Sequence, residues 1–405
     1  MVLKPAKRTE NINEYYFSAK LKEIAVLDRE RKTAGKEGII NLGIGAPDGM
    51  PPAEAVDELV RTASLPDSHA YQSYVGIPEL RQAFASWYSR YYGVDLDYRT
   101  EIQPLTGSKE GVLLVSLAFL DKGDKVLVPD PGYPTYTSAS LLAQAEVLSY
   151  DLVENKGWQP DFESIEKMDL SGVKIMWTNY PNMPTGGMAT KELYEKLVSF
   201  GKKHGIMICN DNPYSFILSD RQFSILGVDG AKEYCIELNS LSKVHNMSGW
   251  RIGMVAGDKD VISQILKVKS QMDSGMFRPL QHAAVRALSC GPAWFSALNE
   301  EYAKRREAAA AIFDALGVEY STDSAGLFLW GKVQKRLRNS SVSWKTSGEL
   351  LSDYLLYKAG IFITPGFIFG NNGKDYIRIS LCANMKVLHD ALHRIMSLQH
   401  EGMAV

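Results

Sequence analysis

The chain has 405 residues, of which 45% are hydrophobic and 23% are charged, and its formal net charge is -2 at pH 7. This length is enough for one large and one smaller domain, each with its own core. The near balance of charge disfavours a nucleic-acid-binding protein, because such proteins usually carry a basic excess. No apolar run approaches the roughly 20 residues that a membrane-spanning helix requires, so we expect no membrane span.

The cysteines and the N-terminal residues favour a reducing compartment. The four cysteines form no C-x-x-C pair and have no close histidine partner; they are Cys209, Cys235, Cys290 and Cys382. A disulfide scaffold and a zinc site are both disfavoured, and buried reduced thiols are expected instead. Residues 1–20 are polar and basic and lack the apolar core of a signal peptide. We therefore expect a cytoplasmic protein without a metal site.

The first two thirds of the chain predict an α/β domain. A helix is expected at residues 15–32, and apolar runs then alternate with segments of helical periodicity. The expected strands are 125–129, 173–178, 206–210 and 234–238, and the expected helices are 109–120, 135–143 and 191–203. Near-continuous apolar strands alternating with helices are typical of a mostly parallel sheet that is flanked by helices on both faces.

The remaining third predicts a smaller α+β domain. Residues 279–316 favour helix except at Gly291-Pro292, where one helix should end and another begin. Strands are then expected near 326–333, at 361–364 and at 376–380, with helices around 347–358 and 386–399. We assign residues 45–290 to the large domain, and residues 1–44 and 291–405 to the small one. Loops rich in Gly, Pro and Asn are expected at 45–52 and 179–187, and such loops commonly carry ligand sites.

The segment Ser240-Leu-Ser-Lys243 offers an amine nucleophile beside an anion site. A predicted strand leads into the hydroxyls of Ser240 and Ser242 and then Lys243, and Gly-Trp-Arg251-Ile-Gly follows. An arginine grips a phosphate with two hydrogen bonds, and a neighbouring cation favours the neutral, reactive form of a lysine amine. Serines and a lysine in a surface loop are the commoner explanation, so this segment needs support from elsewhere.

Asp211-Asn-Pro-Tyr214 follows a predicted buried strand directly. A carboxylate at the end of such a strand suits a ligand with a fixed positive charge, such as the ring nitrogen of pyridoxal phosphate. Tyr214 is placed to reach the hydroxyl of such a ring. Asp, Asn and Pro are also common turn formers, so an ordinary turn is the alternative.

Two further motifs precede predicted helices. Thr-Gly107-Ser108-Lys109-Glu-Gly opens a helix whose free N–H groups and dipole make an anion site, with glycine allowing close approach. A Ser or Thr cap without a ligand is the alternative. Pro-Gly-Tyr133-Pro follows a strand, so that Tyr133 is able to stack on a flat ring or to pack in a turn. Arg378, among apolar residues 376–380, requires a carboxylate partner, which is either a structural acid or a substrate.

From about residue 41 to residue 381 these motifs, in this order, resemble the class I/II aminotransferases, which are fold-type I pyridoxal-phosphate enzymes. Residues 41–48, NLGIGAPD, are similar to the family's glycine loop, and TGSKEG is similar to its phosphate loop. The similarity extends through PGYP, NYPNMPTG, DNPY, SLSK and GWRIG, and ends with ITPGFIFG before Arg378. It implies pyridoxal 5'-phosphate as cofactor and the fold of this family.

The resemblance also implies a role for each motif residue. Lys243 would hold the cofactor as a Schiff base and move protons, and Gly45 and Arg378 would bind the substrate. The other implied cofactor-binding residues are Tyr71, Gly107, Ser108, Lys109, Tyr133, Asp211, Tyr214, Ser240, Ser242 and Arg251. Tyr71 falls where the family's tyrosine reaches the phosphate of the neighbouring subunit, so the resemblance implies a homodimer with shared active sites.

Met183 departs from the family pattern. An asparagine usually stands at this position and hydrogen-bonds the cofactor's ring hydroxyl, whereas a thioether is a weak acceptor and donates nothing. Either Tyr214 alone holds the ring oxygen, or Asn182 replaces the missing amide. We expect an altered pKa for the linkage between Lys243 and the cofactor.

The implied reaction moves an amino group between an L-amino acid and a 2-oxo acid, with glutamate and 2-oxoglutarate as the default pair. A carbon–sulfur β-lyase shares nearly all of these motifs and is the alternative. An amino-acid-sensing regulator lacks room for a DNA-binding domain before the glycine loop, and a dinucleotide enzyme is disfavoured by the late Gly49. Aspartate, alanine, methionine, aromatic amino acids and LL-diaminopimelate all remain open as the other substrate. Arg278 is a candidate for binding an acidic side chain of the substrate, but we favour an ordinary loop arginine.

Overall fold

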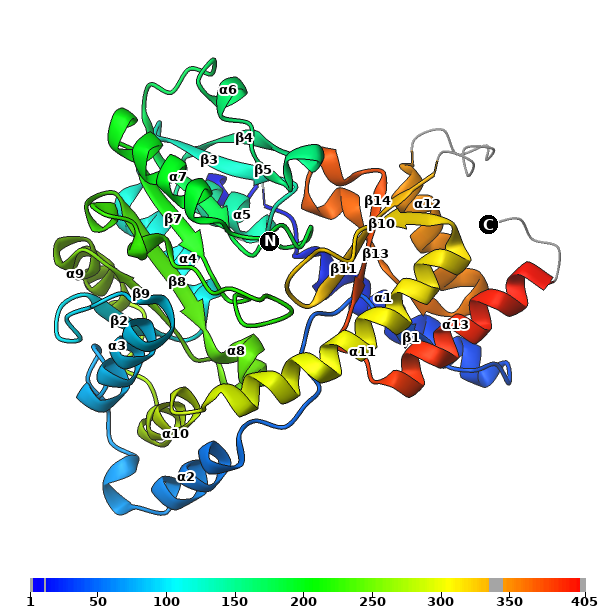
Figure 1. Ribbon diagram of the computed structural model, residues 1–405, viewed down its shortest axis with the longest axis horizontal. Helices are drawn as coiled ribbons and strands as arrows, with labels where there is room; N and C mark the ends of the chain where they lie inside the picture. Colours follow the sequence, from blue (N-terminus) through cyan, green and yellow to red (C-terminus); the bar gives the residue numbers. More distant parts are fainter. Residues whose placement is uncertain (1–2, 11, 335–344, 401–405) are drawn as a thin grey trace.

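The computed structural model describes residues 3–10, 12–334 and 345–400. Its larger sheet has eight strands in the order β2-β9-β8-β7-β6-β3-β4-β5 and occupies one half of the molecule (Figure 1). The strands are β2 (Ile102–Leu105), β3 (Lys125–Asp130), β4 (Glu146–Val153), β5 (Gln159–Pro160), β6 (Val173–Asn179), β7 (Met207–Asp211), β8 (Cys235–Ser240) and β9 (Gly253–Gly257). The four predicted strands are therefore confirmed as β3, β6, β7 and β8, with ends shifted by one or two residues.

The centre of this sheet is parallel and its two ends are antiparallel. Strands β4, β3, β6, β7 and β8 pair in parallel, whereas β9 runs antiparallel to both β8 and β2, and β5 antiparallel to β4. The predicted mostly parallel sheet is thus confirmed, and the antiparallel strands at its ends are an addition to it.

Helices cover both faces of the large sheet. One face packs against α3 (Pro78–Tyr92) and α7 (Lys191–His204), and the other against α4 (Ser108–Phe119), α5 (Pro134–Leu142) and α9 (Lys259–Lys269). Neighbouring residues of β6 separate the two cores, since Met176 belongs to the first and Trp177 to the second. Successive side chains of a strand point to opposite faces, so an all-apolar strand is what a sheet buried on both sides requires.

The smaller unit is built on a four-stranded antiparallel sheet, β10-β11-β14-β13 (Figure 1). These strands are β10 (Val318–Tyr320), β11 (Phe328–Val333), β13 (Thr364–Pro365) and β14 (Tyr376–Ser380), and β1 (Ile40–Asn41) pairs separately with β12 (Ile361–Phe362). Its helices are α1 (Tyr16–Thr33), α12 (Ser347–Tyr354), which continues into a π-helical turn, and α13 (Met385–His400). Phe17 and Ile24 of α1 lie in this second core, as the sequence predicts for the N-terminal helix.

A long helix, α11 (Pro292–Leu316), crosses from one unit to the other (Figure 1). It begins after α10 (Arg278–Leu288), so the predicted break at Gly291-Pro292 is confirmed. Proline fits the first helical position because no N–H is needed there. Phe295 packs in the core of the large sheet, and Phe313 in the core of the small unit.

Among the residues that the structure describes, no helix combines the length and the apolar character needed to cross a membrane. The four cysteines carry no disulfide, and three of them are buried.

Candidate active site

The site lies where three adjacent parallel strands end. Strand β6 ends at Asn179, β7 at Asp211 and β8 at Ser240. In open α/β sheets the carboxyl ends of the strands, and the loops that follow, form the ligand-binding crevice. Asn179 joins two of these ends, because its amide donates to the Asp211 carbonyl at 2.6 Å and its oxygen accepts from Met183 N at 2.7 Å. The loop after β6 is thereby fixed beside Asp211.

Asp211 is a buried carboxylate with one oxygen still free. Its Oδ2 accepts from the Tyr136 hydroxyl at 3.1 Å, and its Oδ1 has no hydrogen-bond partner among the described residues. Burial raises the pKa of Asp211 to about 7, and the Tyr136 hydrogen bond acts in the opposite direction. A buried, unsatisfied acceptor is costly unless a donor reaches it. The site therefore suits a ligand that brings a cationic N–H to this oxygen.

Lys243 lies in a short helix directly after β8. Ser240 caps this helix, α8 (Leu241–Val244), by accepting from Ser242 N, and the Lys243 amine donates to the Gly45 carbonyl at 2.6 Å. Burial lowers the pKa of Lys243, and the nearby Arg378 and Arg251 act in the same direction. A neutral amine is the nucleophilic form, so the surroundings activate this lysine.

An anion cradle faces Lys243 at the start of α4. Gly107 precedes the helix with a φ of 80°, and a Cβ there would lie 2.2 Å from the Arg251 guanidinium. Arg251 Nη1 also lies 3.5 Å from the Ser242 hydroxyl. Glycine lets the guanidinium approach a helix N-terminus, where free N–H groups already favour an anion. The cap is Gly107 without a side-chain hydrogen bond, so the alternative of a Ser or Thr cap is wrong.

Arg378 is a buried cation without an acidic partner. It is 3% exposed and donates to the Gly43 carbonyl at 2.7 Å, while its Nε has no partner among the described residues. The rings of Phe328, Phe369 and Phe17 lie 3.9, 4.7 and 5.5 Å from its guanidinium carbon. Burial lowers the pKa of Arg378 to about 10. No carboxylate of the described chain pairs with it, so the default of a structural acid is wrong.

These groups line a single cavity of about 340 Å³. Of the residues predicted from the sequence, it contains Gly45, Ser108, Lys109, Tyr133, Asp211, Tyr214, Ser240, Ser242, Lys243, Arg251 and Arg378. Gly107 lies against the Arg251 guanidinium, as described above, and Tyr71 is not among the residues that line the cavity. An aldehyde-bearing aromatic cofactor with a phosphate and a protonated ring nitrogen fits the orphaned Asp211 oxygen, the Gly107 cradle and the activated Lys243.

The cavity also contains residues that the sequence did not single out. Tyr15 and Phe17, at the start of α1, close one side, and Lys109 Nζ lies 4.2 Å from the centre of the Tyr15 ring. Tyr136 stacks on Trp177 at 5.1 Å and thereby holds its hydroxyl toward Asp211. Only Tyr136 had a signal in the sequence, because it lies one turn beyond Tyr133 on a helix that starts at the site.

The two residues that were alternatives to the missing asparagine lie in different places. Asn182 is buried outside the cavity lining; its oxygen accepts from the Thr185 hydroxyl at 2.7 Å, and its Nδ2 has no partner among the described residues. Tyr214 lines the cavity, and burial raises the pKa of its hydroxyl, which therefore remains a donor at neutral pH. Met183 lines the cavity too, with its sulfur against Arg378.

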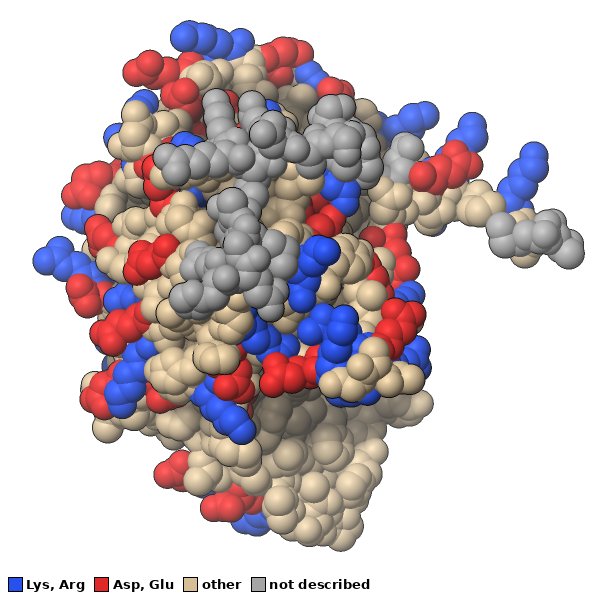
Figure 2. Space-filling view, turned by 90° about the vertical axis from the view of Figure 1, so that its right-hand side faces the viewer, with Lys and Arg blue, Asp and Glu red and all other residues tan. Residues whose placement is uncertain are grey.

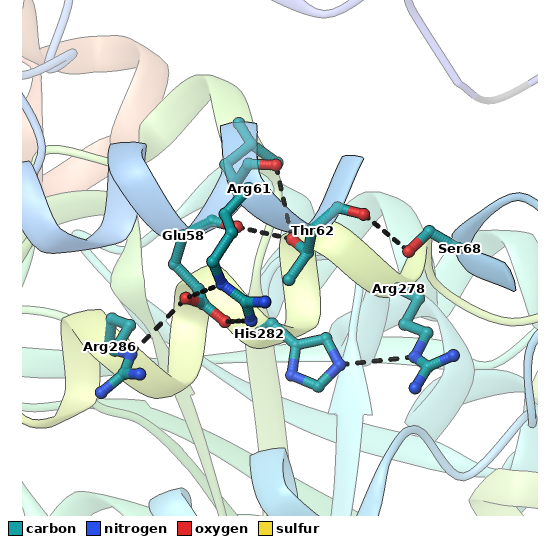
Figure 3. Close-up of polar contacts among 8 residues, drawn as sticks. Glu58, Arg61, Thr62, Ser68, Arg278, His282 and Arg286 are labelled. Atoms are coloured by element: carbon teal, nitrogen blue, oxygen red, sulfur yellow. Dashed lines mark hydrogen bonds and ion pairs between the residues drawn. The ribbon is translucent and has the colours of Figure 1, made fainter. Parts of the chain in front are cut away.

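Arg278 and Tyr71 lie away from this cavity. Arg278 is the first residue of α10, so the prediction of a loop arginine is wrong, and it pairs with Asp67 at 2.6 Å. Figure 3 shows it beside His282, next to a second group in which Glu58 contacts Arg61 and Arg286. Tyr71 is 91% exposed, the highest value among the large hydrophobic residues that the structure describes.

The chain matches the family model described as aminotransferase class I and II over residues 37–395. This chain belongs to the class I and II aminotransferases. LL-diaminopimelate aminotransferase of Dehalococcoides mccartyi is 38% identical over 402 residues, which cover 99% of this chain and 100% of that protein. The enzyme of the same name from Moorella thermoacetica is 38% identical and covers 97% of this chain and 98% of its own. A substrate-bound structure of BacF from Bacillus subtilis has a TM-score of 0.90 at 33% identity, with 98% of each chain covered.

The protein is therefore a pyridoxal-phosphate-dependent aminotransferase of fold type I. The relatives support transamination and give no support to the β-lyase alternative.

Proposed function

We propose that Lys243 is the catalytic residue and that the cavity is divided between cofactor and substrate. Arg251, Ser108, Ser240 and Ser242, with the backbone at Gly107, hold the phosphate of the cofactor, and Lys109 holds either this phosphate or a distal carboxylate of the substrate. Asp211 holds the ring nitrogen, Tyr133 stacks on the ring, and Tyr214 donates to the ring hydroxyl. Gly45 and Arg378 bind the substrate, and Arg378 clamps its α-carboxylate. The single observation that carries this division is that Asp211 and Arg378 are each buried without a charged partner in the described chain.

The chain's own groups account for the proton transfer. Pyridoxal phosphate, when bound, supplies an electron sink for the pair released at the substrate Cα. Burial lowers the pKa of the Lys243 amine, which favours the neutral form in which Nζ takes the proton from Cα and then returns it as an acid. Arg378 fixes the carboxylate so that the Cα–H bond is presented to Nζ, and Phe17, Phe328 and Phe369 keep water from the guanidinium.

We propose a dicarboxylic substrate pair, glutamate with 2-oxoglutarate, and LL-diaminopimelate on the other side. The relatives named for that amino acid suggest it, and the charge of the cavity agrees. Its lining has four basic side chains, Lys109, Lys243, Arg251 and Arg378, against one carboxylate, Asp211. A phosphate and an α-carboxylate engage Arg251 and Arg378, so Lys109 remains for the phosphate or for a distal carboxylate.

A panel of amino acids added to the holoenzyme tests this proposal. Each productive donor should remove the visible absorption of the resting cofactor, and 2-oxoglutarate should restore it. Glutamate and LL-diaminopimelate should act at lower concentrations than alanine or phenylalanine. Saturation by phenylalanine at concentrations where LL-diaminopimelate does nothing would reject the dicarboxylic proposal. If Lys109→Met selectively weakens the binding of dicarboxylic substrates, Lys109 contacts the distal carboxylate. If it weakens the binding of the cofactor instead, Lys109 contacts the phosphate.

We further propose a homodimer in which Tyr71 reaches the phosphate site of the neighbouring subunit. Tyr71 projects from the protein, and Val60, Leu65, Tyr74 and Phe277 are exposed on the same and adjoining segments. Figure 2 shows charged side chains over most of the visible face and few of them at its lower end, the end at which Figure 1 places α2 (Ala53–Ala63) and α10. Exposed apolar surface of this kind marks an interaction site.

Light scattering coupled to gel filtration should give twice the mass of one chain. Tyr71→Phe should then weaken cofactor binding without changing that mass, and a monomer, or a variant with unchanged cofactor affinity, would reject the shared site. We also propose that the enzyme works in the cytoplasm, where free cysteines such as these are kept reduced.

A further inference from the structure

We propose that Arg305 is a positioning residue for the substrate side of the active site, acting through its ion pair with Asp48. The segment that it positions, residues 42–50, is here called the glycine segment. The inference rests on the proposed role of Arg378 as the residue that binds the substrate carboxylate.

The glycine segment places two carbonyl groups in the active site. The Gly43 carbonyl accepts from Arg378 Nη2 at 2.7 Å, and the Gly45 carbonyl accepts from the Lys243 amine at 2.6 Å. A Cβ at Gly45 would lie 2.2 Å from the Phe328 ring, one of the rings that pack on Arg378. A small shift of this segment would therefore move the partners of both Arg378 and Lys243.

The two ends of the segment are held by different means. At its start, Leu42 N donates to the Phe362 carbonyl and Ser380 N donates to the Leu42 carbonyl, each at 2.8 Å, so the backbone joins two strands. Beyond Gly45 the segment has no regular secondary structure. There it is fastened by Asp48, which pairs with Arg305 Nη1 at 2.6 Å, and by the Met50 carbonyl, which accepts from Asn246.

Packing gives little support to this second end. A hollow of about 260 Å³ lies next to it, bounded by the segment on one side and by α11 on the other, where Trp294, Leu298 and Tyr302 line it. Protein interiors are otherwise close-packed, so a segment beside an open volume depends on its specific polar contacts. The Asp48–Arg305 ion pair is the charged contact that joins the segment to α11 beside this volume.

Arg305 joins the segment to the strand that carries Arg378. The same Nη1 lies 3.3 Å from the carbonyl of Leu381, which directly follows β14, and Nε donates to Glu301 at 2.9 Å. Arg305 is 7% exposed, so water does not readily replace a lost partner. One guanidinium thus sets the spacing between the glycine segment and Arg378.

Three holoenzyme variants test the proposal. Asp48→Asn removes the charge on the segment. Arg305→Lys replaces the guanidinium, whose Nη1 contacts both Asp48 and the Leu381 carbonyl, by a shorter amine. Glu301→Gln removes the other acidic partner of Arg305 while leaving Asp48 intact. For each we would measure KM and kcat for glutamate, the dissociation constant of non-reacting glutarate from the change in visible absorption, and the dissociation constant of the cofactor.

Asp48→Asn and Arg305→Lys should raise KM and the glutarate constant by about tenfold, as for the loss of one charged hydrogen bond. The cofactor constant should stay within about twofold, because the groups around the phosphate and the ring lie on other segments, and Glu301→Gln should match the parent. Asp48→Glu should recover part of the glutarate affinity. A loss of cofactor affinity as large as the loss of glutarate affinity would overturn the proposal, as would equal effects of Glu301→Gln.

Failure of the inference is distinguishable from failure of the proposed function. If Arg378→Gln abolishes glutarate binding but Asp48→Asn leaves it unchanged, Arg305 does not position the site, and the role of Arg378 stands. If Arg378→Gln leaves glutarate binding intact, the proposed function itself is rejected, and the inference is overturned with it.

Discussion

Arg378 Nη1 lies 3.2 Å from the sulfur of Met183, so the cation that we assign to the substrate carboxylate faces a thioether. A thioether is a weak acceptor, and it offers no donor to a cofactor oxygen. The strong hydrogen bond of Arg378 within the described chain is therefore the one to the Gly43 carbonyl. The guanidinium keeps most of its donor capacity for an incoming carboxylate.

Met183→Asn should lower the pH at which the linkage between Lys243 and the cofactor titrates, by about one unit. The reason is that an amide N–H stabilises the ring oxygen, which is anionic once the linkage has lost its proton. The visible absorption of the holoenzyme as a function of pH measures the change. Met188→Asn, at a more exposed methionine, is the matched control, and identical titrations for parent and Met183→Asn would refute the expectation.

Lys243→Ala should abolish turnover while the protein still binds the cofactor. The other proposed contacts, at Asp211, Arg251 and the start of α4, are untouched by this change. Stopped-flow absorption with glutamate should show no catalytic phase, and equilibrium dialysis should show bound cofactor. Lys267→Ala, at an exposed helical lysine, should behave as the parent does. Retained transamination in Lys243→Ala would rule out the assignment.

Asp211 should make the cofactor-free protein less stable as the pH rises. Its folded pKa of about 7 lies above the ordinary value of 3.8 for an aspartate, because burial favours the neutral carboxyl. The raised pKa stabilises the folded protein below about pH 4. This stabilisation, at most about 4 kcal/mol, is lost as the pH rises through about 7. Urea unfolding of the cofactor-free parent and of Asp211→Asn at pH 5 and 8 measures this. The difference in unfolding free energy between the two proteins should depend on pH, and a constant difference would contradict the assignment.

Arg378→Lys should raise KM for glutamate by about 10- to 100-fold, because a lysine cannot make the forked contact to a carboxylate. Cofactor affinity should change little, since Arg378 lies on β14 of the small sheet. Steady-state kinetics together with a cofactor titration separate the two effects. A variant whose kcat falls at unchanged KM would show that Arg378 does not bind the ground-state carboxylate.

The site residues that were predicted from the sequence are those whose reactive side chain stands directly at the end of a strand or the start of a helix. Asp211, Ser240 and Lys243 follow apolar strands directly, so their placement at one edge of the sheet follows from the strands themselves. The helix start at Gly107 and the helix that begins after Tyr133 are likewise local. The order of these motifs along the chain then gave the resemblance to a known family.

The parts that were missed depend on contacts between distant segments. Phe17 is more than 300 residues away from Arg378 in the sequence, and it reaches the site because α1 packs on the small sheet. Nothing in the sequence near Phe17 indicates this contact. Arg278 was assigned to a loop because Gly and Pro lie nearby, whereas Pro279 occupies the first turn of a helix there. The antiparallel strand β9 was also missed, because GMVAG is short and contains two glycines.

Helix α11 has a consequence for how the protein unfolds. Its first turn is rooted in the core of the large sheet through Phe295 and its last turns in the core of the small unit through Phe313, without an intervening loop. Each of the two cores therefore includes side chains of this one continuous helix. When either unit unfolds, α11 loses its packing at that end, and the helix then packs less well in the core of the other unit. Calorimetry should therefore record a single heat-absorption peak for both units.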